Sequence, residues 1–107
     1  MRGMFREALK GHLDLMVLAS LEREPAHGYA IVSMIRARTR GTFDLADGTI
    51  YPALQRLDDA GLLKSSWTLV NGRSRRVYGL TARGRAELAR RRRGWRTFSL
   101  AVSRAIG

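Results

Sequence analysis

Residues 47–63 read DGTIYPALQRLDDAGLL. At 3.6 residues per turn, this stretch predicts a helix with a narrow apolar stripe on one face. The stripe consists of Ile50, Leu54 and Leu57. Gly61 follows at the position where a helix commonly ends in a left-handed residue. A stripe this narrow anchors the helix to a core on one side and leaves its other faces free for a partner.

Pro52 lies near the predicted start of this helix. A proline costs little there if the helix begins near Gly48 or Thr49, because the N–H groups of a first turn have no partners within the helix. The free N–H groups and the helix dipole also favour a phosphate at this end. The start of the helix is therefore predicted to face an anion.

The outer surface of the N-terminal half of this helix carries polar and aromatic side chains. They are Thr49, Tyr51, Pro52, Gln55 and Arg56. Gln can pair with adenine and Arg with guanine in the major groove of DNA. In the alternative interpretation, Tyr51 and Pro52 only pack within the protein, and Arg56 pairs with Asp58 or Asp59 on the helix surface.

Two further helices are predicted before this one. The first spans about residues 11–22, and residues 2–10 either extend it or form a short helix of their own. Pro25 then interrupts the chain at a point suited to the start of a new helix. The second helix spans about residues 26–38, and a loop connects it to the stretch quoted above.

Two runs of alternating residues follow and flank Asn71-Gly72, which is the strongest short-range signal for a β-hairpin. A two-residue turn places Trp67 opposite Arg76, whereas a four-residue loop places it opposite Tyr78. Both registers keep one set of side chains on the same face. The set is Trp67, Tyr78 and Leu80.

The C-terminal residues predict one long helix from about residue 82 to 106, with Thr81 as its N-cap. An apolar seam runs along it and consists of Leu88, Trp95, Phe98 and Val102. A helix of about 24 residues is roughly 36 Å long. The first 80 residues cannot cover that length, so part of the seam is expected to meet a second copy of the chain.

This order of elements predicts a mainly α fold with a β-hairpin wing, that is, a winged helix-turn-helix followed by a long dimerisation helix. Residues 1–80 form the expected DNA-binding domain and residues 81–107 the expected dimerisation helix. The wing tip carries Arg73, Arg75 and Arg76, which suit phosphates or a narrow minor groove.

The charge distribution also points to an anionic partner. The 107 residues carry a formal net charge of +11. Nine basic and eight acidic residues precede position 71, whereas eleven basic residues and one acidic residue follow position 70. Such asymmetry favours nucleic acid first and an anionic membrane second. No apolar run approaches the roughly 20 residues of a membrane span, and we expect a cytoplasmic, nucleoid-associated protein.

The residues resemble those of the PadR family of bacterial transcription regulators. The resemblance rests on GHLDLMVLASLEREPAHGYAI (residues 11–31), the stretch at 47–63, Trp67 and RRVYGLTARG (residues 75–84). It implies a dimeric winged-helix protein, in most members a repressor, whose C-terminal helices build the dimer. Members of the family respond to phenolic acids or to drug-like aromatic molecules. The all-arginine wing and the short, basic final helix depart from common members.

The leading hypothesis is therefore a dimeric repressor that binds a palindromic operator in double-stranded DNA. The alternative is a basic adaptor that binds a membrane surface or an acidic protein through its last helix. No enzyme activity, cofactor or metal is expected, because the chain contains no cysteine, P-loop or dinucleotide fingerprint. Trp95 and Phe98 of two copies either bind a small planar aromatic effector or simply fill the interface.

Overall fold

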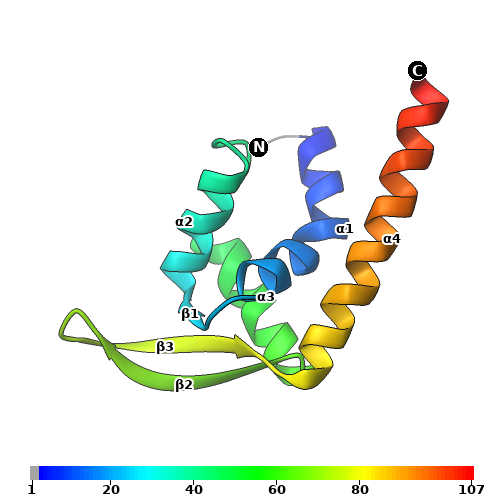
Figure 1. The fold of residues 1–107 in the computed structure, drawn as a ribbon. Helices are drawn as coiled ribbons and strands as arrows, with labels where there is room; N and C mark the ends of the chain where they lie inside the picture. The colour runs from blue at the N-terminus through cyan, green and yellow to red at the C-terminus, as the bar shows by residue number, and fades with distance from the viewer. Residues whose placement is uncertain (1–2) are drawn as a thin grey trace.

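The structure, a computed structural model, describes residues 3–107, with side chains from residue 7 onward. In this part of the chain, four helices and a small sheet form the fold (Figure 1). The elements are α1 (Gly3–Ser20), β1 (Ala26–His27), α2 (Gly28–Arg38), α3 (Asp47–Asp59), β2 (Leu63–Val70), β3 (Arg73–Leu80) and α4 (Ala82–Ile106). The first helix thus includes residues 3–10 without interruption, while Arg2 lies outside the described residues.

The hairpin of β2 and β3 forms the wing, and its register is the one set by a two-residue turn. Trp67 pairs with Arg76, and Val70 pairs with Arg73 across the turn. Asn71 and Gly72 have φ angles of 53° and 78°. Two consecutive residues in the left-handed region are what a type I′ turn requires, and its twist matches that of the strands.

A third strand was not predicted from the sequence. The two residues of β1 pair antiparallel with β3, so the sheet order is β1-β3-β2. Ala26 lies opposite Tyr78, and His27 lies opposite Val77. A two-residue strand has no periodicity to detect, and its partner is some 50 positions away along the chain. Its effect is to fix the start of α2 beside the wing.

The core lies where α1, α2 and α3 meet above the sheet. Its most deeply buried large side chains come from these three helices and the turn after α1. They are Val17, Leu18, Leu21, Ile31, Ile50 and Leu54. Burying a side chain of this size contributes roughly 1.5–3 kcal/mol. Because Ile50 and Leu54 belong to α3, the core fixes how that helix is presented to solvent.

The fold is a winged helix-turn-helix with a long last helix, as the sequence predicts. The first turns of α4 pack into the same core as the rest, since Leu88 is only 3% exposed. Thr81 caps the helix by accepting a hydrogen bond from the Gly84 N–H at 3.0 Å. The C-terminal half then extends past the other helices (Figure 1). Within the described residues, no helix is long and apolar enough to cross a membrane.

Candidate nucleic-acid interface

The predicted apolar stripe holds α3 in the core. Ile50, Leu54 and Leu57 are all buried, together with Ala53. The helix begins at Asp47, slightly earlier than the sequence suggested. Pro52 is therefore its sixth residue and lies beyond the first turn, so that part of the prediction was wrong. The Gly48 carbonyl consequently has no N–H four residues ahead to accept from.

The opposite surface of α3 is open to solvent. Tyr51, Pro52, Gln55 and Arg56 are exposed, and Thr49 is half-buried. The Gln55 side-chain amide donates to Asp59 Oδ1 at 2.9 Å. Arg56 does not pair with Asp58 or Asp59, because its Nη2 donates to Asp14 Oδ1 of α1 at 2.6 Å.

The Tyr51 ring lies directly on the backbone of Gly28 at the start of α2. A Cβ atom at Gly28 would come within 2.7 Å of Tyr51 Cε1. Only glycine leaves room for the ring in this position. The close approach fixes one edge of α3 against the helix before it, as expected for the two helices of a helix-turn-helix.

The start of α2 adds Tyr29, which is not among the residues that the sequence predicts to bind DNA. Tyr29 is 66% exposed, and its ring stacks on His27 with the centroids 6.4 Å apart. The His27 Nδ1 accepts a hydrogen bond from the Ala30 N–H at 3.2 Å and so caps the helix. Burial, and to a smaller extent Arg75, hold the pKa of His27 below its ordinary value, which favours the neutral form needed for this cap. The sequence signal for this part of the surface is the motif His27-Gly28-Tyr29, which lies within residues 11–31.

The three wing arginines have different surroundings. Arg73 is exposed, and Arg75 is half-buried beside a groove that separates the wing tip from α2. Arg76 lies further along β3, where its Nε donates to Ser65 Oγ at 3.1 Å and its guanidinium lies 6.0 Å from the Trp67 ring centroid. Arg73 and Arg75 are thus the freer charges at the tip.

The groove brings the wing tip and the start of α2 together. Its lining includes Tyr29, Ser33, Asn71, Arg73 and Arg75. The cationic wing side chains therefore lie next to the positive end of the α2 dipole and to an exposed phenol. Hydroxyl groups, arginines and helix N-termini are the groups that most often bind DNA phosphates.

The predicted seam on α4 divides into a buried part and an exposed part. Leu88 belongs to the domain core, so little of its surface remains for a partner. Trp95, Phe98 and Val102 are 43, 57 and 40% exposed. The His12 ring of α1 lies edge-on to Trp95, with the centroids 4.8 Å apart, and Phe98 lies 6.2 Å from Trp95.

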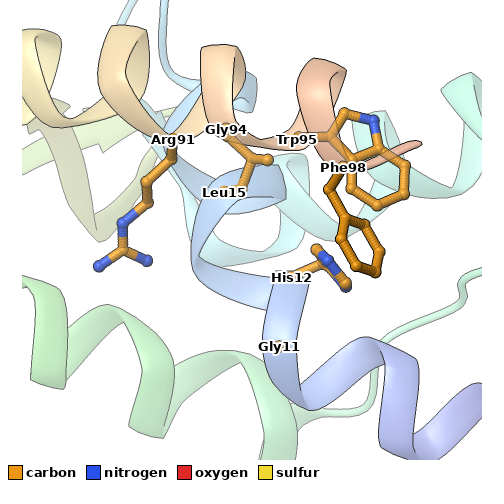
Figure 2. Close-up of a pocket in the computed structure, with 7 residues that line it drawn as sticks. All are labelled: Gly11, His12, Leu15, Arg91, Gly94, Trp95 and Phe98. Carbon is orange, nitrogen blue, oxygen red and sulfur yellow. The ribbon is translucent and has the colours of Figure 1, made fainter. Parts of the chain in front are cut away.

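A cavity of about 290 Å³ lies between α1 and α4 at these rings. Figure 2 shows Trp95, Phe98 and His12 gathered at one end and Arg91 at the other, with Leu15 between them. A second hollow of about 390 Å³ adjoins the same rings on the side of Met16 and Phe43. The surface around Trp95 is therefore aromatic, concave and open.

Comparisons with known proteins agree with this arrangement. The model of the Transcriptional regulator PadR-like family matches residues 17–90. The Transcriptional regulator Rv3488 of Mycobacterium tuberculosis is 36% identical over 88 residues, which cover 82% of this chain and 79% of that protein. A PadR family transcription regulator from hypervirulent Clostridium difficile R20291 is 30% identical, with a TM-score of 0.79 over 91% of this chain and all of that one.

The chain belongs to the PadR-like family of transcriptional regulators. Bacillus subtilis PadR, solved in complex with operator DNA, is 27% identical with a TM-score of 0.64. That match covers 72% of this chain and 44% of the Bacillus protein. The family assignment confirms the resemblance found in the sequence and gives no support to the alternative of a membrane adaptor.

Proposed function

We propose that this chain is a dimeric transcription regulator that binds a specific palindromic operator and represses transcription. The observation that carries the proposal is the outer surface of α3. Its stripe is buried, while Tyr51, Pro52, Gln55 and Arg56 remain exposed on a helix that the core holds rigidly. A helix presented in this way suits the major groove, where base edges can be told apart.

The remaining contacts are assigned to the DNA backbone. Arg73, Arg75 and Arg76 of the wing, with Tyr29 at the start of α2, are proposed to bind phosphates or the minor groove. Thr49 at the start of α3 is proposed to act in the same way. Support comes from the net charge of +11 and from the operator complex of Bacillus subtilis PadR. Such contacts make binding strongly dependent on salt.

The dimer is proposed to form through the exposed part of the α4 seam, mainly Trp95, Phe98 and Val102. These side chains lie on the part of α4 that extends past the other helices and are 40–57% exposed. Replacing Val102 with Asp places a charge on this part of the seam and is expected to yield monomers in light scattering. Arg104→Asp, two residues away on the same turn, is the matched control. If Val102→Asp stays as dimeric as the wild type, this interface is wrong.

A small planar aromatic effector is proposed to bind at Trp95 and Phe98 and to release the DNA. The open cavity at these rings supports the assignment. Planar aromatic ligands are expected to quench tryptophan fluorescence, and the quenching should be lost in Trp95→Phe but kept in Trp67→Phe. Quenching that is kept in Trp95→Phe but lost in Trp67→Phe would place the ligand at the wing. Equal quenching in all three proteins would mean that the Trp95 and Phe98 rings only fill the interface.

DNA binding is tested with the DNA upstream of the chain's own operon. Fluorescence anisotropy should show tighter binding to this DNA than to a random duplex of equal length and composition. The affinity for both should fall steeply as salt rises. Equal affinity for the two duplexes would rule out sequence-specific repression.

A further inference from the structure

Asp14 of α1 is placed between the DNA-reading surface and the aromatic cavity. Its Oδ1 accepts a hydrogen bond from Arg56 Nη2 of α3 at 2.6 Å. Its Oδ2 lies 3.6 Å from Arg91 Nη1 of α4. One carboxylate thus contacts two guanidinium groups that belong to different helices and to different proposed surfaces.

The two arginines differ in what else they can bind. Arg91 also donates from Nε to Glu87 Oε2 at 2.6 Å, and it lines the cavity that contains Trp95. Arg56 has Asp14 as its ion-pair partner, and its side chain is 58% exposed on the flank of α3 that faces α1. The Asp14 side chain is 23% exposed. The ion pair of Arg56 with Asp14 is therefore accessible enough for Arg56 to leave Asp14 and bind DNA.

We propose that Asp14 is a positioning residue that withholds Arg56 from DNA, and that Arg91 weakens this hold. The inference rests on the proposed function, because it assumes that Arg56 meets DNA. Arg91 reduces the negative charge that Arg56 experiences at Asp14 and repels the Arg56 guanidinium. When Arg91 stays on Asp14, Arg56 leaves more readily for a phosphate or a guanine.

The same geometry couples ligand binding in the cavity to DNA binding by α3. A ligand that draws Arg91 towards the rings takes it away from Asp14. The carboxylate then binds Arg56 alone, and DNA loses that contact. The coupling passes through one shared carboxylate and requires no movement of α3. Binding of the ligand lowers the affinity for DNA, as in a repressor that its effector releases.

A double-mutant cycle on operator affinity tests the coupling without any effector. Arg91→Gln removes the second cation from Asp14. Arg92→Gln is the matched control, because it removes the same charge from the adjacent residue, whose guanidinium pairs with Glu22 at 2.9 Å. Both changes are made in the wild-type chain and in the Asp14→Asn background, and all affinities are measured at one moderate salt concentration.

Arg91→Gln is expected to weaken operator binding about two- to fivefold more than Arg92→Gln, the size that partly exposed ion pairs allow. In the Asp14→Asn background, the two changes should have equal effects. The inference is overturned if they are equal in the wild-type chain, or if the difference persists without Asp14. Arg91→Met and Arg92→Met, which also remove the charge, replace the two Gln changes if Arg91→Gln does not fold.

The outcome separates the inference from the proposed function. If the wild-type chain shows no preference for operator DNA over a random duplex, the proposed function fails and the inference fails with it. If the preference is present and the cycle shows no coupling through Asp14, only the inference is overturned.

Discussion

Gly84 allows an unusually close approach between the first turn of α4 and the turn that follows α3. A Cβ atom at this position would lie 2.0 Å from the Leu62 carbonyl oxygen and 3.3 Å from Leu80 Cδ2. The carbonyl belongs to the backbone and also accepts a hydrogen bond from the Thr81 N–H at 3.1 Å. Neither group can move aside without disturbing the junction between α3, the wing and α4.

Gly84→Ala is therefore expected to destabilise the fold although alanine is the better helix former. The propensity gain is about 1 kcal/mol. Against it stand a lost backbone hydrogen bond, worth about 1 kcal/mol, and overpacking of about 1–3 kcal/mol. The net loss is about 1–3 kcal/mol. For a domain of this size, each kcal/mol lowers Tm by about 4–8 °C.

Gly94→Ala in the same helix is the matched control, because nothing lies within 4 Å of its added Cβ atom. It should raise stability by up to about 1 kcal/mol, so the same chemical change has opposite signs at the two positions. Both variants are unfolded by denaturant at one protomer concentration, since the proposed dimerisation would make stability depend on concentration. A Gly84→Ala chain as stable as the wild type would refute the packing described for this junction.

Three more changes test other parts of the molecule. His27→Asn keeps the cap on the Ala30 N–H but does not titrate. Because the pKa of His27 in the folded protein lies below its ordinary 6.5, the wild type should lose more stability than this variant as pH falls from about 7.5 to 5.5. Equal losses of the two proteins in a denaturant series would contradict the cap. Gly72→Ala should cost about 1 kcal/mol in thermal unfolding, because its φ of 78° strains any side chain; a neutral effect would argue against the type I′ turn. Arg75→Ala should weaken binding to all DNA sequences alike. It should also lower the slope of log affinity against log salt concentration by about 1 relative to Arg73→Lys, which keeps its charge. A loss of affinity confined to the operator would instead make Arg75 a residue that reads bases.

The helices and the hairpin could be predicted because their signals are local. The stripe at Ile50, Leu54 and Leu57 has helical spacing, and Asn71-Gly72 fits one kind of turn. The start of α3 differs slightly, because the helix begins at Asp47 rather than near Gly48 or Thr49, and Pro52 is therefore not in the first turn. Its true place is beyond that turn, where the burial of Ile50 and Leu54 outweighs one missing hydrogen bond.

The long-range contacts could not be predicted from these patterns. The pairing of Arg56 with Asp14 joins residues 42 positions apart, and the sequence offered nearer acids as partners. Tyr51 packs on Gly28 for the same kind of reason, since only the fold brings them together. The sequence groups Leu88 with Trp95, Phe98 and Val102 in one seam on α4, but Leu88 is buried by the first 80 residues, which reach further along the helix than its periodicity reveals.

The central claim is that the outer surface of α3 reads bases in each half of a palindromic site. The most direct measurement compares the wild type with Thr49→Ala, Tyr51→Phe, Gln55→Ala and Arg56→Ala on a set of operators that carry single base-pair changes. The wild type should lose about 1–3 kcal/mol at several positions, arranged symmetrically in half-sites about one helical turn apart. At least one variant should lose discrimination at a single position in each half-site. If every variant weakens binding to all operators by the same factor, α3 does not read the sequence.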